Sequence, residues 1–360
     1  MAITIKYVRS DAVGEGTGNT NTVEDAYTLA EVGVNHAPGI EFRFINSGTF
    51  LSTGNQTYNN DGTGEAPIIF TGRNLADTNY ENCYINGQTY YMAFNGKSQI
   101  IKYIDIVSST TGATLQINDA KSMVYNCKIK NTSTTATGAA NALCVLNGIA
   151  FNNYIESITN YSSLSTVGTL RLYGGIAFGN KIISRYIGIL QTGATSISNN
   201  LIIGNSPGDE STGIYKSSFY NLCFLHRNTI YNFTYGISIP GSTDSAEVVH
   251  IIDNLFHTIQ EPNPSTNPLE NGYCIYLRTL TTSDYMINTT NNRYYNCDNF
   301  SQGDKYNLGN VECISDPFNY TDVSPSYDIN PPDYTLNDIA DGGTLCRNIV
   351  YPAYNWTWNH

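Results

Sequence analysis

The chain has 360 residues and a formal net charge of −12 at pH 7, with only 18 Lys and Arg residues. A phosphate backbone is bound by clustered basic side chains, so this charge balance argues against a nucleic-acid partner. The sequence holds no apolar stretch of about 18 residues, which argues against a membrane span and a membrane partner.

Residue usage favours strands and turns, because Gly (31) and Tyr (28) are abundant while only 13% of residues are charged. The eight cysteines show no CxxC pair and no zinc-type spacing, so we expect buried reduced thiols. The segment 59–62 lacks the ligand pattern of a calcium loop and is interpreted as a turn. We therefore expect no metal and no cofactor.

The first predicted element is a helix over residues 22–33. Thr22 and Asp25 have a spacing like that of a capping box, and Gly33 provides a stop. The glycine-rich segment 14–18 before it is interpreted as a flexible turn, because no Lys-Ser/Thr follows as in a phosphate loop. The helix is short and precedes a repeat, so we expect it to cap the first coil.

A repeat follows, in which a polar pair precedes an apolar or aromatic residue. These apolar anchors are Ile85, Ile106, Ile129, Ile155, Ile182, Ile202, Ile230, Phe256 and Tyr294. Their spacings of 20 to 28 residues suit a coil of three short strands, and one spacing of 38 marks an insertion at the Pro-rich segment 262–268. Gly188, Gly213 and Gly236 mark a second strand in each coil. The repeat predicts an all-β fold, a single right-handed parallel β-helix of about ten coils.

Asparagine recurs two residues before six of these anchors. Because side chains alternate along a strand, residues two apart point the same way, here into the coil. The six residues are Asn153, Asn180, Asn200, Asn228, Asn254 and Asn292. Buried amides are costly unless hydrogen-bonded, so we predict a stacked ladder in which each amide bonds the next.

The C-terminal part resembles the closing segment of right-handed parallel β-helix repeat proteins, the pectate-lyase-like superfamily. The resemblance rests on Asp316-Pro317-Phe318, on the segment 333–336 and on Asp341-Gly342-Gly343. It implies a fold used by polysaccharide lyases, glycosidases, phage tailspikes and other virion proteins. The segment 342–347 is similar to the ends of phage β-helix proteins. We expect an N-terminal segment with the capping helix (1–40), the β-helix (41–315) and an irregular C-terminal cap with an aromatic tail (316–360).

Among the outward-facing positions, four charged residues form a set that could be catalytic. Asp105 is expected beside Lys128, and Lys130 beside Glu156. If the protein is an enzyme, these four residues are the catalytic candidates. We favour ion pairing between coils, because a glycosidase needs two facing carboxylates and no second one is expected nearby.

A second outward set is apolar and aromatic, and we call it the apolar stripe. It contains Ile183, Ile203, Tyr231, His257, Tyr295, Leu201 and Leu255. It is interpreted as a protein interface, as a surface covered by a loop such as 259–271, or as a platform of Tyr rings that binds sugar. The aromatic tail, with Tyr351, Tyr354, Trp356 and Trp358, is a further interface candidate.

These features favour a non-enzymatic phage virion structural protein, either a capsid decoration or a tail-associated component. We expect it to contact other capsid or tail proteins and itself as a homo-oligomer. The first residues lack a signal-peptide pattern, so we expect synthesis in the host cytoplasm and a final place in the virion. The alternative is a β-helix that binds a glycan or degrades polysaccharide as a lyase or glycosidase.

Overall fold

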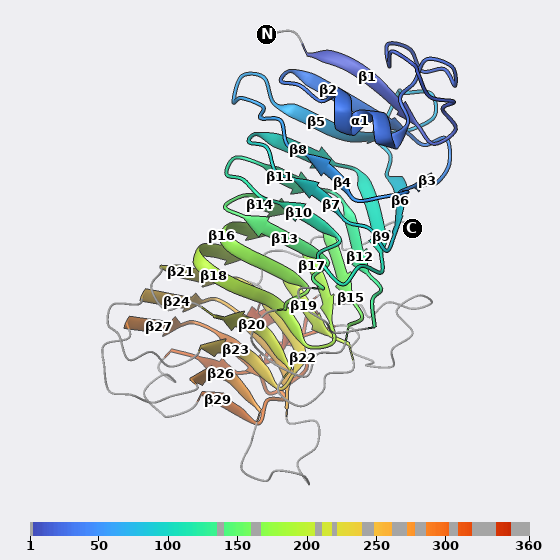
Figure 1. Cartoon of the computed structure of the whole chain (residues 1–360). Helices are drawn as coiled ribbons and strands as arrows, with labels where there is room; N and C mark the ends of the chain where they lie inside the picture. The colour runs from blue at the N-terminus through green and yellow to red at the C-terminus, as the bar shows by residue number, and fades with distance from the viewer. Residues whose placement is uncertain are drawn as a thin grey trace. The chain divides into compact units, whose positions relative to one another are not determined.

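The computed structural model describes residues 3–134, 140–159, 167–205, 211–217, 222–239, 248–260, 272–277, 286–301, 309–318 and 336–346. The chain forms two compact units, Met1–Ile182 and Ile183–His360, and the boundary falls within β17 (Lys181–Ser184). Figure 1 shows strands stacked side by side in each unit. Each unit is described by itself.

The first unit contains three rows of parallel strands. Row 1 consists of β4 (Gln56–Tyr58), β7 (Met92–Phe94), β10 (Leu115–Ile117), β13 (Leu143–Leu146) and the first half of β16 (Leu170–Phe178). Row 2 consists of β1 (Thr4–Arg9), β2 (Ile40–Ile45), β5 (Ile68–Arg73), β8 (Gln99–Lys102), β11 (Met123–Tyr125), β14 (Ile149–Phe151) and the second half of β16. Row 3 consists of β3 (Phe50–Leu51), β6 (Cys83–Gln88), β9 (Ile104–Ser108), β12 (Lys128–Asn131) and β15 (Tyr154–Ser157), and β17 follows β15 in the same sheet.

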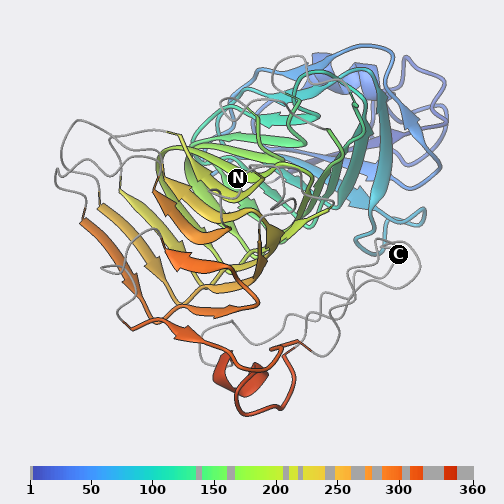
Figure 2. The ribbon, with the colours of Figure 1, turned by 90° about the horizontal axis from the view of Figure 1, so that it is seen from below.

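The second unit repeats the three rows, and Figure 2 shows its strands in yellow and orange. Row 1 consists of the first half of β18 (Ile187–Ser198), β20 (Thr212–Lys216), β23 (Tyr235–Ile239), β26 (Tyr273–Leu277) and β29 (Asn299–Ser301). Row 2 consists of the second half of β18, β21 (Cys223–His226), β24 (Val248–Ile252) and β27 (Met286–Thr290). Row 3 consists of β19 (Leu201–Gly204), β22 (Thr229–Phe233), β25 (Leu255–Ile259), β28 (Arg293–Tyr295) and β30 (Val311–Glu312).

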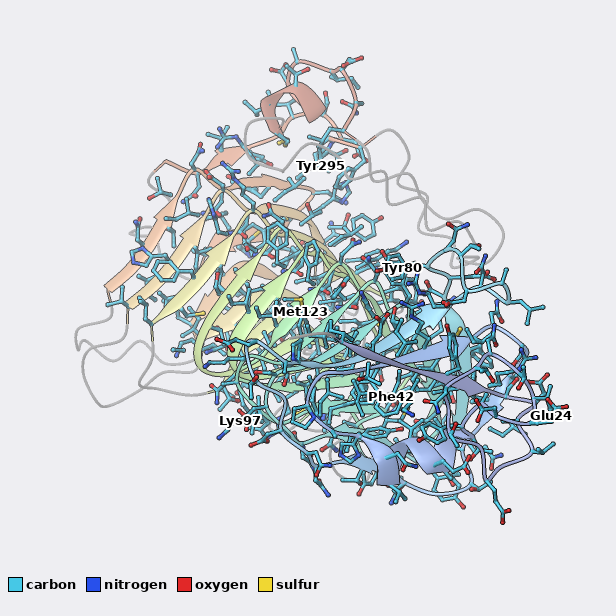
Figure 3. The ribbon with its side chains drawn as sticks, turned by 90° about the horizontal axis from the view of Figure 1, so that it is seen from above. Glu24, Phe42, Tyr80, Lys97, Met123 and Tyr295 are labelled. Carbon is cyan, nitrogen blue, oxygen red and sulfur yellow. The ribbon has the colours of Figure 1, made fainter. Side chains whose placement is uncertain are left out.

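The core lies inside the coils because alternate residues of each strand point inward. The predicted anchors from Ile85 to Phe256 are all buried, and Tyr294 is half-buried. Figure 3 shows Phe42 within the coils and Glu24 and Lys97 at the surface. Gly213 meets a tight constraint, since a Cβ there would lie 2.4 Å from Ile230 Cγ2. A glycine at the second position of these strands, as in the sequence pattern of Gly188, Gly213 and Gly236, therefore reflects a narrow interior.

The predicted amide ladder is present in both units. In the first unit, Asn153 Nδ2 donates to Asn180 Oδ1 at 3.0 Å and to the Val124 carbonyl at 3.0 Å. In the second unit, the same bond joins each of Asn200, Asn228, Asn254 and Asn292 to the next asparagine, at 2.8–3.1 Å. The last acceptor is Asn310, which the sequence pattern missed because Glu312, and not an apolar residue, stands at the anchor position of the strand that follows, β30.

The polar residue before each ladder position has its own role. Asn152, Asn199 and Asn291 have φ values of 51°, 55° and 57°. Asn tolerates this left-handed conformation better than most residues, because its short polar side chain bonds locally. The Asn-Asn pairs of the repeat therefore combine a turn residue with a ladder residue.

The capping helix is shorter than predicted and begins later. Helix α1 (Leu29–Asn35) starts at the capping box of Thr28 and Glu31, and Leu29 and Val32 are buried. The prediction that it begins at Thr22 is wrong, because the Asp25 carboxylate instead accepts bonds from Thr17 and Thr20 and closes a turn. These bonds hold the pKa of Asp25 well below its usual range. Gly33 lies within the helix.

The predicted fold class, an all-β right-handed parallel β-helix with a short capping helix, is confirmed. All eight cysteines are free thiols, seven of them buried. The division at residues 40 and 315 stays a prediction, although β1 lies within the predicted cap segment and pairs with β2. Among the described residues, no helix is long and apolar enough to span a membrane.

Candidate functional site

A groove lies on the outer face of row 1 in the first unit, across β10, β13 and β16. The strand register places Gln116 beside Cys144 and Cys144 beside Arg171. It also places Leu146 beside Tyr173. Their neighbours along each strand, such as Leu143 and Val145, are buried inside the coil. Parallel pairing therefore arranges the outward side chains in two columns.

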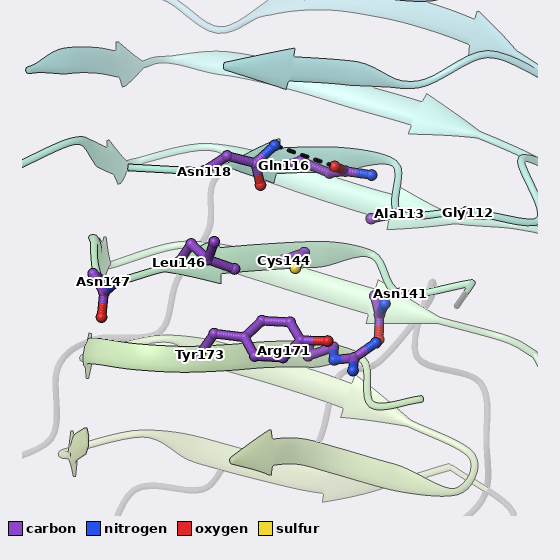
Figure 4. A pocket seen from close by; sticks show the side chains of 10 residues that line it. All are labelled: Gly112, Ala113, Gln116, Asn118, Asn141, Cys144, Leu146, Asn147, Arg171 and Tyr173. Carbon is purple, nitrogen blue, oxygen red and sulfur yellow. Dashed lines mark hydrogen bonds between the residues drawn. The ribbon is translucent and has the colours of Figure 1, made fainter. Parts of the chain in front are cut away.

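The groove has a volume of about 560 Å³ and is shown in Figure 4. Its lining is made of Gly112, Ala113, Gln116, Asn118, Asn141, Cys144, Leu146, Asn147, Arg171 and Tyr173. Amide side chains stand at the upper strand and at the edge, and Arg171 and Tyr173 come from the lower strand. The surface offers hydrogen-bond donors and acceptors together with one aromatic ring and one cation.

Arg171 is the charged group of the groove. Its guanidinium carbon lies 4.3 Å from the centre of the Tyr173 ring, and its buried Nε has no hydrogen-bond partner. Burial lowers the pKa of Arg171 and raises the pKa of the neighbouring Cys144 to about 11. No described carboxylate forms an ion pair with Arg171. A half-buried cation without an anion favours an anionic ligand.

The amides at one end of the groove are held in a chain of hydrogen bonds. Asn118 Nδ2 donates to Asn95 Oδ1 at 2.6 Å, and Asn95 Nδ2 donates to Asn59 Oδ1 at 2.8 Å. Asn118 Nδ2 also lies 3.4 Å from Gln116 Oε1 (Figure 4). These bonds fix the orientation of amides that can bind hydroxyl groups.

The lining limits the chemistry that the groove can perform. Among its ten described residues, none is Asp or Glu, so this surface lacks the acid pair of a glycosidase. The part of the chain that the structure describes also contains no cluster of three or more His, Cys, Asp or Glu suited to a metal ion. The groove is suited to binding an anionic, hydroxyl-rich ligand. The sequence reasoning missed it because it followed only the positions beside the anchors, in row 3.

The predicted charged candidates lie on the outer face of row 3 in the first unit. Lys130 Nζ forms an ion pair with Glu156 Oε1 at 2.9 Å, as the ion-pair interpretation predicts. Asp105 does not form the expected pair with the Lys128 ammonium. Its Oδ1 instead accepts from the Lys128 backbone N–H at 3.0 Å and from Asn82. Burial raises the pKa of Asp105.

The Lys128 side chain turns towards Tyr154, whose ring centre lies 5.2 Å from Nζ. Lys181, which the sequence reasoning did not select, approaches the same ring at 5.8 Å and is 8% exposed. Burial lowers the pKa of Lys181, an effect that Glu156 opposes and Lys128 reinforces. A compact charged group is thus formed by Lys128, Tyr154, Lys181, Glu156 and Lys130.

The apolar stripe is outward-facing but not exposed. Its side chains from Ile183 to His257, with Leu201 and Leu255, are buried, and Tyr295 is half-buried. Phe318 stacks on His257 at 5.2 Å, and His257 Nε2 lies 3.1 Å from Asp316 Oδ1. Of the three interpretations that the sequence left open, the burial of these side chains fits cover by another segment of the chain, and at His257 the segment 316–318 provides that cover. The proposed loop cover, 259–271, and the predicted insertion at 262–268 fall mostly or wholly outside the described residues.

Apolar side chains are partly exposed on the outer face of row 2 in the first unit. Ile100, Met123, Ile149 and Ile176 occupy one column, in which Ile176 is 40% exposed. Sequence reasoning missed this column because it did not examine row 2. The tail residues Tyr351, Tyr354, Trp356 and Trp358 lie outside the described residues, so their interface role stays a prediction.

No protein-family model matches the chain, and no curated protein matches it either. Among solved structures, pectate lyase Pel9A aligns over 90% of this chain and 84% of its own, with a TM-score of 0.55 and 13% identity. A rhamnogalacturonan lyase aligns over 96% and 97% (TM-score 0.43, 16% identity). An alginate lyase from Paenibacillus sp. str. FPU-7 aligns over 79% and 94% (TM-score 0.43, 12% identity).

The likeness to Pel9A shows the β-helix fold alone, because the identity is low. These comparisons do not bear on the predicted phage-specific similarity, the virion location or the virion and homo-oligomer partners. All of these stay predictions from the sequence.

Proposed function

We propose that the chain binds an acidic polysaccharide, a chain of uronate sugars, in the groove across β10, β13 and β16. The observation that carries the proposal is the half-buried Arg171 guanidinium, which stacks on Tyr173 and has no described carboxylate partner. A sugar carboxylate supplies the missing anion in a charge-assisted hydrogen bond. The fold is shared with a pectate lyase, so a polysaccharide ligand suits the architecture.

The other groove residues support a sugar ligand. Gln116, Asn118 and Asn147 offer amide groups to hydroxyls, and the Tyr173 ring offers apolar surface to the face of a sugar. The described lining lacks an acid pair, and its one strong cation is engaged in binding. The proposal is therefore binding without cleavage, which follows the carbohydrate alternative of the sequence prediction rather than the virion role.

Calorimetric titration with oligogalacturonate tests the proposal. We expect binding of the charged oligosaccharide and none of the same oligosaccharide after its carboxylates are reduced to alcohols. Arg171→Gln is expected to weaken binding about tenfold or more, since a hydrogen bond to a charged group contributes roughly 1.5–3 kcal/mol. Arg185→Gln, a change outside the groove lining, is the matched control and is expected to bind as the unmodified chain does.

Two results would contradict the proposal. Equal affinity for the charged and reduced oligosaccharides would show that Arg171 does not select an anion. Release of unsaturated uronate ends, measured by their ultraviolet absorbance, would show that the chain is a lyase and does not merely bind.

A further inference from the structure

Two thiols meet at the C-terminal end of the second unit. Cys313 Sγ lies 3.6 Å from Cys346 Sγ, although the residues are 33 positions apart in the sequence, and both side chains are buried. Cys313 follows β30, and Cys346 is the last residue of α2 (Gly343–Cys346). A disulfide bond is about 2.05 Å long, so the sulfurs are in contact but not bonded.

The backbone around the two thiols is held together independently of the sulfurs. Phe318 and Leu336 form an antiparallel bridge. The Asn337 N–H donates to the Pro317 carbonyl at 3.0 Å, and the Ser315 N–H donates to the Asp341 carbonyl at 3.3 Å. The fold therefore brings the two sulfurs together before any covalent bond exists, which removes most of the entropic cost of closing the loop.

The two thiols are chemically unequal. A hydrogen bond from Cys346 lowers the pKa of Cys313, and the nearby Arg293 guanidinium lowers it further. The same contact and burial raise the pKa of Cys346. Cys313 is thus the thiol that ionises first, and a thiolate is the attacking species in thiol–disulfide exchange.

We propose that Cys313 and Cys346 are a site of reversible oxidation, where a low-molecular-weight disulfide converts them to an intramolecular cross-link. The Cys313 thiolate attacks one sulfur of the small disulfide, which forms a mixed disulfide and releases one small thiolate. The Cys346 thiolate then attacks the Cys313 sulfur, which forms the Cys313–Cys346 bond and releases the second. The protein loses two electrons and two protons, and the small disulfide becomes two thiols.

The cross-link has a consequence for the apolar stripe. The segment 316–318 begins three residues after Cys313 and packs on His257, one residue of the stripe. Oxidation ties the start of this segment to α2 and reduces the conformational entropy of the unfolded C-terminal segment, which stabilises the contacts with His257. Reduction leaves the segment held on His257 only by noncovalent contacts, so the exposure of His257 becomes redox-dependent.

The test uses the full chain treated with oxidised glutathione, alkylated and digested without reductant. Mass spectrometry is expected to find a linked peptide that contains Cys313 and Cys346, and two of the eight titratable thiols are expected to disappear. The oxidised chain is expected to show a higher thermal midpoint and slower hydrogen exchange in β22 and β25 than the reduced chain. These readouts need no variant, so they hold even if a cysteine substitution prevents folding.

Cys313→Ser is expected to abolish both the linked peptide and the stability gain. The matched control is Cys83→Ser, which removes a buried thiol that contacts the Phe44 carbonyl in the first unit and leaves the oxidation intact. Eight thiols remaining after oxidant, or a linked peptide between other cysteines, would overturn the proposal. A linked peptide without slower exchange in β22 and β25 would overturn the claim that the cross-link stabilises the contacts with His257.

Discussion

The outer face of row 3 is charged in the first unit and apolar in the second. In the first unit it carries Lys128, Lys130, Glu156 and Lys181, and in the second it carries Tyr231 and His257. Both sets lie beside the inward-facing anchors of row 3 and point outward by the same alternation. In the charged set, Lys130 pairs with Glu156 and Lys128 lies over the Tyr154 ring, whereas both side chains of the apolar set are buried and the segment 316–318 packs on His257. The direction in which a side chain points is thus set by its own strand, but its exposure depends on segments that are distant in the sequence.

Truncating the side chain that covers His257 is expected to change the free energy of unfolding more than the other substitutions that follow. Phe318 is 4% exposed and stacks on His257, so Phe318→Ala is expected to lower the free energy of unfolding by about 3 kcal/mol. His257, the stripe residue on which Phe318 stacks, then becomes exposed, and the variant is expected to bind a hydrophobic dye. Chemical denaturation followed by circular dichroism measures the loss of stability.

The control for this substitution is Phe224→Ala in the same unit. Phe224 is 41% exposed, so its truncation is expected to change stability much less and leave dye binding unchanged. Equal losses for the two variants would show that Phe318 is not an anchor of the cover.

On the charged face, we expect a substitution that changes stability less than Phe318→Ala and that raises it. Lys181 is nearly buried beside Lys128, and its ammonium forms no ion pair with a described residue. Lys181→Met is therefore expected to stabilise the chain by on the order of 1 kcal/mol, because a buried charge is replaced by an apolar group of similar size. Lys102→Met, at a more exposed lysine of row 2, is the control, for which we expect little gain.

The gain from Lys181→Met is expected to depend on pH. Burial lowers the pKa of Lys181 from its usual value of 10.5, so the unfolded chain binds more protons between the lowered pKa and 10.5. Stability of the unmodified chain therefore rises with pH across that window, and the advantage of the variant shrinks there. An advantage that grows with pH would contradict the assigned direction of the pKa shift.

The repeat made the fold predictable, because the ladder and anchors recur at fixed offsets that depend only on neighbouring residues. Asn153 and Asn228 could be assigned to the interior in this way, and the structure confirms both. The capping helix was misplaced because Thr22 and Asp25 have the same spacing as the true capping box, Thr28 and Glu31, and the Asp25 carboxylate is engaged by Thr17 and Thr20.

The candidate site could not be found in the same way. Gln116, Cys144 and Arg171 become neighbours only through the pairing of row 1, whose spacing is set by turns of unequal length. The cover of the apolar stripe was likewise hidden, since His257 and Asp316 are 59 residues apart. Local patterns predict which way a side chain points, but predicting contacts between coils requires the length of every turn between them.

The smallest expected effect concerns the ion pair that the sequence did predict. Lys130 Nζ and Glu156 Oε1 are 2.9 Å apart, and their side chains are 30% and 13% exposed. A double-mutant cycle with Lys130→Met and Glu156→Gln is expected to give a coupling free energy of about 0.5 kcal/mol, because solvent and salt screen a pair that is partly exposed. The coupling should fall further in high salt. A coupling free energy as large as the stability lost in Phe318→Ala would mean that the contacts of the charged face stabilise the fold as much as those of the covered face. The two faces of row 3 would then differ in their chemistry and not in their contribution to stability.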